Sequence, residues 1–481
     1  MTDDQTFDQM GVMTATRHLI GSRGVTFENA FASYPLCCPS RSTFLTGQYA
    51  HNTGVQGNRP FGDGGGYVAL REPKRILPAW LYAAGYETVH LGKWANSPGP
   101  SVPPGWDWWG RTFNHTTNYY DFSIREADGS ETHYGADAAD YQTDLLTQRA
   151  LDWLAERDNH DPFLLSIAYL APHAGQGRDD AAGRRCEGVD QKGFAQPPPR
   201  YAGRYVEGGV PQTPSYNEPD ISDKPAAVAP PLLSAPTLEK ADRSYTCSLA
   251  TLLAVDDSVK RLVAALRRSG ELANTVVLFT SDQGKFYGEH RQGGGKNLPY
   301  DEATRIPLLI RGPGIRPGQL VGDPVVNADI APTLLDLLGV DPKPSLARPR
   351  DGRSLLPQIV GRRDDPNRLV LIEGKQKFIE LDSGDGYESS SYQGVRSVDY
   401  LYVEYRSALF DRAREASDAP FGAGEVAGTE LYDLRSDPFQ IENRSDDPAY
   451  APTRRALADA LAKLRDCVGE DCLLSARIPR P

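Results

Sequence analysis

The sequence predicts an α/β fold, in which a mostly parallel sheet is flanked by helices, followed by a smaller C-terminal α+β domain. Over the first two-thirds of the chain, short apolar runs bounded by turn residues alternate with amphipathic stretches. This pattern is typical of buried parallel strands covered by helices. Past about residue 365, strands separated by turns and one final helix replace the alternation. We therefore expect two domains, residues 1–365 and residues 366–481.

The strand candidates of the first domain end at polar or turn residues, and sites in such sheets lie at the carboxyl ends of the strands. Two amphipathic stretches predict helices: one has apolar residues between 146 and 154, and a longer one covers about residues 241–268 before Gly270. The second domain adds strands with turns, such as Val395–Tyr405, and a helix at about 452–466. The strand candidates of the first domain are Tyr86–Leu91, Phe163–Tyr169, Thr275–Thr280 and Ile306–Ile310.

Two regions depart from the alternation. Residues 175–240 hold ten prolines between Pro197 and Pro236 and few apolar runs. We expect a long loop excursion there, of a kind that is more often functional than idle. The chain also opens on the acidic turn Thr2–Gln5, with no strand before it and without the residue order of a signal peptide. We expect the numbering to start inside a longer natural chain.

The composition excludes several classes of protein. With 39% hydrophobic residues over 481 positions, the chain can form a packed core. Its 64 acidic and 52 basic residues give a net charge of -12, which argues against binding to nucleic acid but not against a local cationic pocket for a small anion. No apolar run approaches the roughly 18–20 residues that cross a bilayer, so we expect no membrane span.

The most informative stretch is residues 37–47, which read C-C-P-S-R-S-T-F-L-T-G. Two buried cysteines before a helix would explain the first three letters but not the whole string. The string resembles the signature of type I sulfatases, C-x-P-S-R-x-x-x-L-T-G. In that family a separate formylglycine-generating enzyme oxidises the first cysteine, here Cys37, to formylglycine, whose gem-diol attacks a sulfate ester and later expels sulfate. The resemblance implies that Arg41 holds the modified residue.

The resemblance also implies a metal site. Alone, the pairs Asp3-Asp4 and Asp282-Gln283 could be turns or helix caps. Together they resemble the divided metal site of sulfatases, which has two aspartates early in the chain and an Asp-Asn pair late, and which usually holds one Ca²⁺. Oxygen ligands suit such a hard cation. Gln283 replaces the commoner Asn, but its amide still offers a carbonyl oxygen.

Three cationic residues resemble sulfatase positions that contact the sulfate. Alone, a lysine is most often a surface group and a histidine is most often structural. The resemblance implies that Lys93 bridges gem-diol and sulfate, while His173 and Lys296 face the leaving oxygen and the sulfate, one of them as general acid. Many sulfatases carry a histidine two residues after the first of these lysines. Ala95 occupies that position here, which leaves the base of the final elimination open.

The resemblance covers nearly the whole chain and implies an alkaline-phosphatase-like fold. The Cys-Cys-Pro form, residues 92–96 and the loop at 217–225 are most similar to the N-acetylglucosamine-6-sulfatase branch. The family begins with a strand that leads into the paired aspartates, and this sequence lacks it. We therefore expect Asp3 and Asp4 to lie at a frayed terminus, with poor folding or weak metal binding as the consequence.

Four further cysteines bear on cellular location. Cys467 and Cys472 could close a small loop, and Cys186 and Cys247 could pair across the proline-rich excursion. Two such bridges favour an oxidising compartment. We expect a secreted, periplasmic or lysosomal protein.

The expected function is hydrolysis of a sulfate ester on a sulfated sugar or glycan, with a divalent cation and a formylglycine made from Cys37. Two alternatives are open at this point. One is a phosphonate or phosphate monoester hydrolase on the same scaffold. The other is a non-catalytic protein that binds sulfated glycans and in which Cys37 is never converted.

Overall fold

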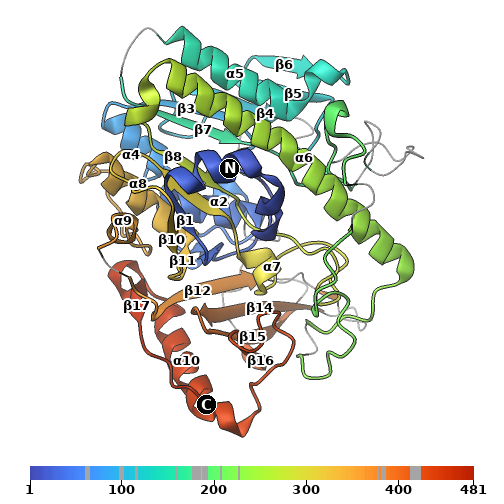
Figure 1. The fold of residues 1–481 in the computed structure, drawn as a ribbon. Helices are drawn as coiled ribbons and strands as arrows, with labels where there is room; N and C mark the ends of the chain where they lie inside the picture. The colour runs from blue at the N-terminus through green and yellow to red at the C-terminus, as the bar shows by residue number, and fades with distance from the viewer. Residues whose placement is uncertain are drawn as a thin grey trace.

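Three main sheets organise the chain, two of mixed direction and a third that is antiparallel (Figure 1). The expected α/β fold is confirmed, with antiparallel pairs alongside the parallel ones. No helix in the described part of the chain is both long and apolar enough to span a membrane. The structure, a computed structural model, describes the chain except residues 60–64, 97–101, 114–116, 158–160, 176–185, 187–192, 206–208, 226–227, 363, 376–378, 381–385 and 412–423.

The first sheet contains two of the expected strands, which pair with each other at one end of the strand order. Its strands follow the order β6 (Glu131–Tyr134), β5 (Phe122–Glu126), β4 (Trp108–Phe113), β3 (Glu87–Gly92) and β7 (Phe163–Ala168). Strand β3 pairs in parallel with both β4 and β7, whereas β5 is antiparallel to both of its neighbours, β4 and β6. The parallel strands end beside Lys93 and the segment that leads to His173, so both residues leave the same edge of this sheet.

The second sheet contains the other two expected strands. It follows the order β10 (Gln319–Val321), β1 (Val25–Phe27), β9 (Leu308–Arg311) and β8 (Val277–Thr280). Strands β1 and β10 are parallel, while β9 is antiparallel to both β1 and β8. Beside it, β2 (Ala30–Phe31) and β11 (Val325–Val326) form a short parallel pair.

The first residues of the chain join these two sheets. The Thr2 amide donates to the carbonyl of Thr280 at 3.0 Å, and the Asp3 amide donates to the carbonyl of Ala171 at 3.2 Å. Thr2 and Asp3 thus bridge in parallel to the segments that follow β8 and β7, and Asp3 is 0% exposed. The expectation of a frayed terminus is therefore wrong, because the backbone of residues 1–3 is hydrogen-bonded on both sides.

Two long helices cover one face of the first sheet. Helix α5 (Gln142–Glu156) packs along α6 (Ala235–Arg268), which also contacts α1 (Thr14–Leu19) (Figure 1). Helix α6 starts six residues before the expected boundary because Pro236 occupies its first turn, where its missing amide costs nothing. A disulfide between Cys186 and Cys247 attaches the loop before α6 to the middle of the helix.

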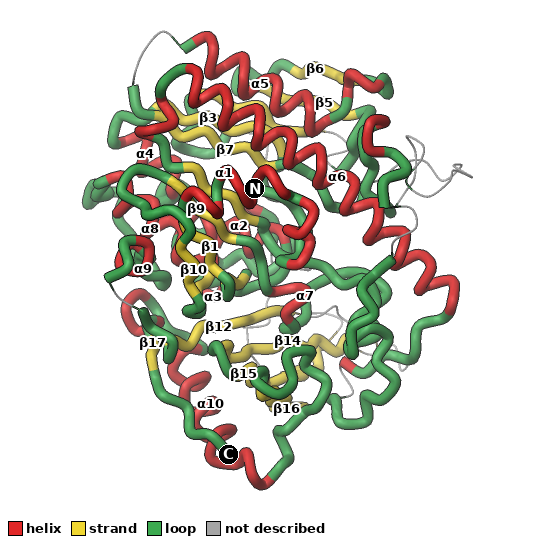
Figure 2. The backbone as a smooth tube through the Cα atoms, in the orientation of Figure 1, coloured by secondary structure: helices red, strands yellow, loops and turns green. Residues whose placement is uncertain are grey.

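The loop expected at 175–240 is anchored at several points in its described parts, which Figure 2 shows mainly as loop. The Gly175 amide donates to the carbonyl of Phe194 at 2.8 Å. The Val210 amide donates to Asp242 on α6 at 2.9 Å. Nζ of Lys224 donates to the hydroxyl of Tyr432, far along the chain, at 3.0 Å. The excursion therefore packs against both α6 and the C-terminal sheet.

The C-terminal sheet is antiparallel and shares a core with the preceding part of the chain. Helix α10 (Ala451–Leu464) packs on it, and its core cluster includes Phe31 and Tyr49. The guanidinium of Arg368 forms a buried bidentate salt bridge with the carboxylate of Asp329, with N–O distances of 2.6 and 2.7 Å. The strands are β16 (Glu425–Asp433), β15 (Tyr400–Asp411), β14 (Gly386–Arg396), β12 (Arg368–Lys375), β17 (Leu474–Ser475) and β13 (Ile379–Glu380), the last beside β14.

The remaining helices are short. Helices α2 (Cys37–Thr46), α4 (Leu77–Ala83) and α8 (Ile330–Leu338) adjoin one another. The others are α3 (Ala50–Thr53), α7 (Asp301–Thr304) and α9 (Leu356–Ile359), with 3-10 turns at Asp8–Val12, Gly21–Arg23, Tyr67–Ala69, Ala138–Asp140, Pro199–Tyr201, Glu271–Asn274, Asn327–Asp329, Pro448–Tyr450 and Gly469–Cys472.

A buried histidine ties α3 to the C-terminal segment. Nδ1 of His51 lies 3.0 Å from a carboxylate oxygen of Glu373 on β12, and Nε2 lies 2.9 Å from the carbonyl of Cys467. Cys467 forms the second expected disulfide, with Cys472. Burial alone would lower the pKa of His51, but Glu373 raises it to about 9.

This histidine makes part of the stability dependent on pH. Because the folded pKa of about 9 exceeds the ordinary value of 6.5, its contribution is fully present below pH 6.5 and is lost as the pH rises through about 9. We expect His51→Gln to lower the free energy of unfolding most below pH 6.5, and the difference from wild type to shrink toward pH 9. Urea unfolding at several pH values measures this, and a difference that stays constant would contradict it.

Candidate active site

The cysteine motif forms helix α2, and the motif explains both of its ends. Leu36 is extended, and Pro39 sits in the first turn, where its missing amide leaves no donor unsatisfied. Gly47 ends the helix in the left-handed conformation, with φ at 71°. Cys37 is therefore the first residue of the helix, with 1% of its surface exposed. Its side chain stands at the amide end of the helix, where negative charge is favoured.

Four polar side chains surround the Cys37 sulfur, which stands in for the oxygens that a hydrated aldehyde at this position would carry. Nζ of Lys296 lies 3.1 Å from Sγ, Nε2 of Gln283 lies 3.6 Å away and Nζ of Lys93 lies 3.7 Å away. Oδ1 of Asp3 is 3.8 Å from the same sulfur. Burial raises the pKa of the Cys37 thiol, and Lys296 and Lys93 only partly oppose this. The thiol is thus held in its protonated, weakly nucleophilic form.

Carboxylate oxygens of two expected metal ligands, Asp3 and Asp4, lie beside this sulfur. Carboxylate oxygens of Asp3 and Asp4, the Cys37 sulfur and a ring nitrogen of His173 all lie within 4.8 Å of one another. Nε2 of Gln283 donates to Asp4 at 2.6 Å, while its Oε1 is buried and accepts no hydrogen bond in the described part of the chain. A buried amide oxygen without a partner, next to two carboxylates, fits a hard divalent cation.

Asp282 is turned toward the protein rather than toward that group. Its Oδ2 accepts from Nε of Arg41 at 2.8 Å, and its Oδ1 accepts from the amides of Asp4 and Gln283 at 3.1 and 2.9 Å. Burial and the nearby charge of Asp3 raise the pKa of Asp282 to about 6, against the pull of Arg41. Asp282 therefore braces the backbone of the other ligand candidates in this arrangement.

Each of the three carboxylates is paired with a different cation. Lys93 pairs with Asp3, Lys296 pairs with Asp4, and Arg41 pairs with Asp282. Burial alone would raise the pKa of Asp4, but Lys296 and His173 hold it well below its ordinary range. Burial alone would likewise lower the pKa of Lys296, but Asp4 raises it well above its usual value. Asp4 and Lys296 are thus held in their charged forms although they are largely buried.

Arg41 connects the acidic group to the loop after β3. Its Nη1 donates to the carbonyls of Lys93 and Trp94 at 2.7 and 2.9 Å, and its Nη2 lies 3.4 Å from Asp3. Through these contacts Arg41 orients Lys93 and Asp282 around Cys37.

His173 stands at the more open side of the site. Its Nδ1 lies 2.7 Å from the carbonyl of Ala174, and its Nε2 lies 3.7 Å from Asp4. The side chain is 22% exposed, against 3% for Lys93 and 13% for Lys296. Burial lowers the pKa of His173 to about 4, although Asp4 acts in the opposite direction. The ring is therefore neutral at neutral pH, with its proton directed to Ala174.

Two residues next to this site, Cys38 and Lys285, were not among the expected site residues. Cys38 exchanges hydrogen bonds with the backbone of Asn96, at 2.9 and 3.3 Å, and so holds the loop after Lys93. Lys285 is buried near Asp4, and burial lowers its pKa. Their signals were present, since Cys38 adjoins Cys37 and Lys285 follows Gln283 by two residues.

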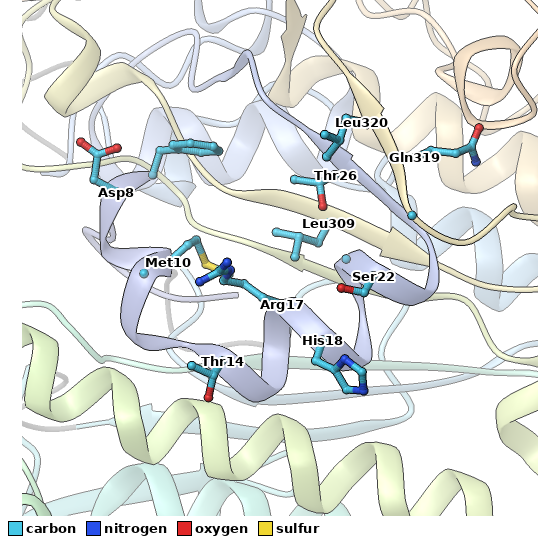
Figure 3. Close-up of a pocket in the computed structure, with 14 residues that line it drawn as sticks. Asp8, Met10, Thr14, Arg17, His18, Ser22, Thr26, Leu309, Gln319 and Leu320 are labelled. Carbon is cyan, nitrogen blue, oxygen red and sulfur yellow. The ribbon is translucent and has the colours of Figure 1, made fainter.

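A cavity of about 660 Å³ lies elsewhere, between α1 and β10, and none of the nine expected site residues lines it. Figure 3 shows Met10, Arg17 and Leu309 around it, from three different segments. It lacks the paired carboxylates and lysines that surround Cys37. The residues that the sequence predicts for the site therefore gather at Cys37 and not around this cavity.

Comparison with known proteins gives a consistent result. A family model described as sulfatase matches residues 1–340. The N-acetylglucosamine-6-sulfatase of Homo sapiens is 30% identical over 98% of this chain and 84% of its own length. The extracellular sulfatase SULF-1 homolog of Drosophila melanogaster is 32% identical over 88% of this chain, but this chain spans only 36% of that protein.

A solved structure shares the fold over nearly its whole length. It is a protein in complex with its substrate D-glucosamine-2-N,6-O-disulfate, and it has a TM-score of 0.71 at 22% identity. The similarity covers 97% of this chain and 96% of that one.

The pairing of Arg41 with Asp282 can be tested by stability. Arg41→Met leaves a buried carboxylate without its cation, and we expect the free energy of unfolding to fall by about 3–5 kcal/mol. The matched control is Arg480→Met, because Arg480 is 72% exposed and pairs with Asp399 at 3.7 Å. That variant should stay within about 1 kcal/mol of wild type. Equal effects of the two substitutions in urea unfolding would contradict the importance of the buried pair.

Proposed function

The chain belongs to the sulfatase family, and we propose that it hydrolyses a sulfate ester on a sulfated sugar or glycan. The observation that carries the proposal is the convergence of Lys93, Gln283 and Lys296 on the sulfur of Cys37. A sulfate ester is an anion that needs cationic partners and a nucleophile at one point. The relatives named N-acetylglucosamine-6-sulfatase favour a 6-sulfated glucosamine as the reacting unit.

The proposed nucleophile is a formylglycine at position 37, made from Cys37 by a separate formylglycine-generating enzyme. Its hydrated aldehyde would supply one hydroxyl that attacks sulfur and a second that allows sulfate to be released. The raised pKa of the thiol supports a need for conversion, because a buried, protonated thiol is a poor nucleophile. Lys93 and Lys296 would hold the substituent of residue 37 and the sulfate oxygens.

The proposed metal ligands are Asp3, Asp4 and Gln283, together with Asp282, whose carboxylate contacts Arg41 and two backbone amides in this arrangement. The proposed ion is Ca²⁺. Oxygen donors alone suit this ion, and the unsatisfied Oε1 of Gln283 supports its coordination. A divalent ion there would offset the carboxylate charges and draw electrons from a sulfate oxygen.

His173 and Lys296 are the two candidates for the general acid, and they differ in which of them carries a proton at neutral pH. The His173 ring is neutral at neutral pH, with its proton directed to the Ala174 carbonyl. Lys296 keeps its proton, because Asp4 holds its pKa well above the ordinary value. We propose that His173 and Lys296 face the leaving oxygen and the sulfate, one of them as general acid, while Arg41 positions Lys93 and Asp282.

The proposed location is outside the reducing cytoplasm, as a secreted, periplasmic or lysosomal protein. The disulfides Cys186–Cys247 and Cys467–Cys472 support it, because such bridges persist in oxidising compartments.

Activity of protein from its native host tests the reaction class. We expect Cys37→Ala to lower kcat/KM on 4-nitrophenyl sulfate by at least about 10³-fold, because the nucleophile is removed. Cys38→Ser, at the neighbouring buried position, serves as the control and should retain far more activity. We also expect wild type to hydrolyse the sulfate ester faster than the matched aryl phosphonate ester. A faster phosphonate reaction would favour the alternative hydrolase.

Metal binding gives a second test, with a readout besides activity. Because an ion that binds only the folded protein stabilises it, Ca²⁺ added after chelation should raise the thermal midpoint of wild type. Asp4→Asn removes one charged ligand and should abolish most of that increase. An equal increase in both proteins, measured by calorimetry, would place the ion elsewhere.

A further inference from the structure

Lys285 is a buried cation without an anionic partner among the residues that the structure describes. It is 9% exposed, and its Nζ donates to the hydroxyl of Ser244 at 3.4 Å. The same nitrogen lies 5.3 Å from the ring centroid of Tyr287. No carboxylate in the described part of the chain lies within 4.0 Å of it. Its polar contacts are thus a single long hydrogen bond and an aromatic face.

The charges around Cys37 leave Lys285 unmatched. The carboxylates of Asp3, Asp4 and Asp282 are already paired with Lys93, Lys296 and Arg41. The nearest charged groups to Lys285 include Asp4 and Lys296, which pair with each other. A divalent cation at the carboxylates would add still more positive charge. Since burying an ammonium group without a counter-charge is costly, its presence is best explained by an anion that arrives with the substrate.

A series of contacts links the segment after His173 to Lys285. Gly175, two residues after His173, donates its amide to the carbonyl of Phe194 at 2.8 Å. The guanidinium of Arg243 lies over the Phe194 ring, 4.5 Å from its centroid. Ser244, the next residue on α6, accepts the hydrogen bond from Lys285. Lys285 also follows by two residues Gln283, whose amide nitrogen lies 3.6 Å from the Cys37 sulfur, so it belongs to the segment that forms the site.

We infer that Lys285 binds a second anionic group of the substrate, a sulfate or a carboxylate carried close to the sulfate ester that is cleaved. The inference rests on the proposed function. An ammonium group has three donors and can serve either kind of anion by charge-assisted hydrogen bonds. A neutral acetamide or hydroxyl at the same position gains no such charge interaction. Lys285 thus makes the site selective for polyanionic sugars.

The test compares substrates that differ only in the second anion. The substrates are N-acetylglucosamine-6-sulfate, glucosamine-2-N,6-O-disulfate and a glucuronate disaccharide of the first sugar. The selectivity is the ratio of kcat/KM for each dianion to kcat/KM for the monoanion. We expect a ratio well above one in wild type, and Lys285→Gln should lower it about 10- to 100-fold, the range for one charge-assisted hydrogen bond. The dianion whose selectivity ratio falls more in Lys285→Gln shows whether the bound group is a sulfate or a carboxylate.

Two further variants separate recognition from structure. Lys285→Arg keeps the positive charge and should retain most of the selectivity. Lys260→Gln removes an equal charge from an exposed position on α6 and should leave the ratio at the wild-type value. The thermal midpoint of each variant shows whether it is folded. If a sugar is not turned over, its inhibition constant against 4-nitrophenyl sulfate hydrolysis replaces kcat/KM in the ratio.

The outcomes distinguish this inference from the proposed function. Absence of hydrolysis of every sulfate ester by converted wild type would overturn the proposed function itself. With that activity present, a wild-type ratio near one would overturn the assignment of Lys285. So would equal losses on monoanion and dianions in Lys285→Gln, because a residue that only orients Asp4 would affect all substrates alike. If Lys285→Gln does not fold, the selectivity ratios of wild type and of Lys285→Arg decide instead.

Discussion

The structure depends on the burial of three ion pairs around one cysteine. Ionised groups are expensive to remove from water, and only close partners of opposite charge and further hydrogen bonds offset that cost. Asp3, Asp4 and Asp282 are each matched by a different cation. These groups come from the first residues of the chain, helix α2, the loop after β3 and the segments that follow β8. The fold is thus required to bring all of these segments to one point.

The sheets achieve this because their strands end at a common edge. Strands β3 and β7 are parallel neighbours, so Lys93 and the segment carrying His173 leave the first sheet together. Strand β8 leads to Asp282 from the second sheet, and the backbone of Thr2 and Asp3 joins both sheets. Helix α2 then directs Cys37 into the same space. Few of these positions are set by local sequence alone, because each depends on pairing between segments hundreds of residues apart.

The sequence predicted the site better than the contacts within it. The motif at 37–47 identified Cys37, and short apolar runs located β3 and β7 to within a residue or two. The anchoring of Asp3 was not predictable, because its partners, such as the Ala171 carbonyl, are backbone groups of distant segments. The partners of Arg41 depend likewise on where Asp282 and the loop at Lys93 meet. Lys285 could not be predicted as a site residue, because a single lysine belongs to no sequence motif. Only the structure shows that it is buried without a nearby carboxylate among the described residues.

The central claim is that the buried charges exist to serve a converted residue at position 37. Mass spectrometry of the peptide that contains Cys37, from protein made in its native host, tests this most directly. The account predicts a residue whose thiol has been replaced by an aldehyde or its hydrate, with Cys38 in the same peptide unchanged. An intact thiol at Cys37 in active protein would contradict it, because the nucleophile would then have to be another group.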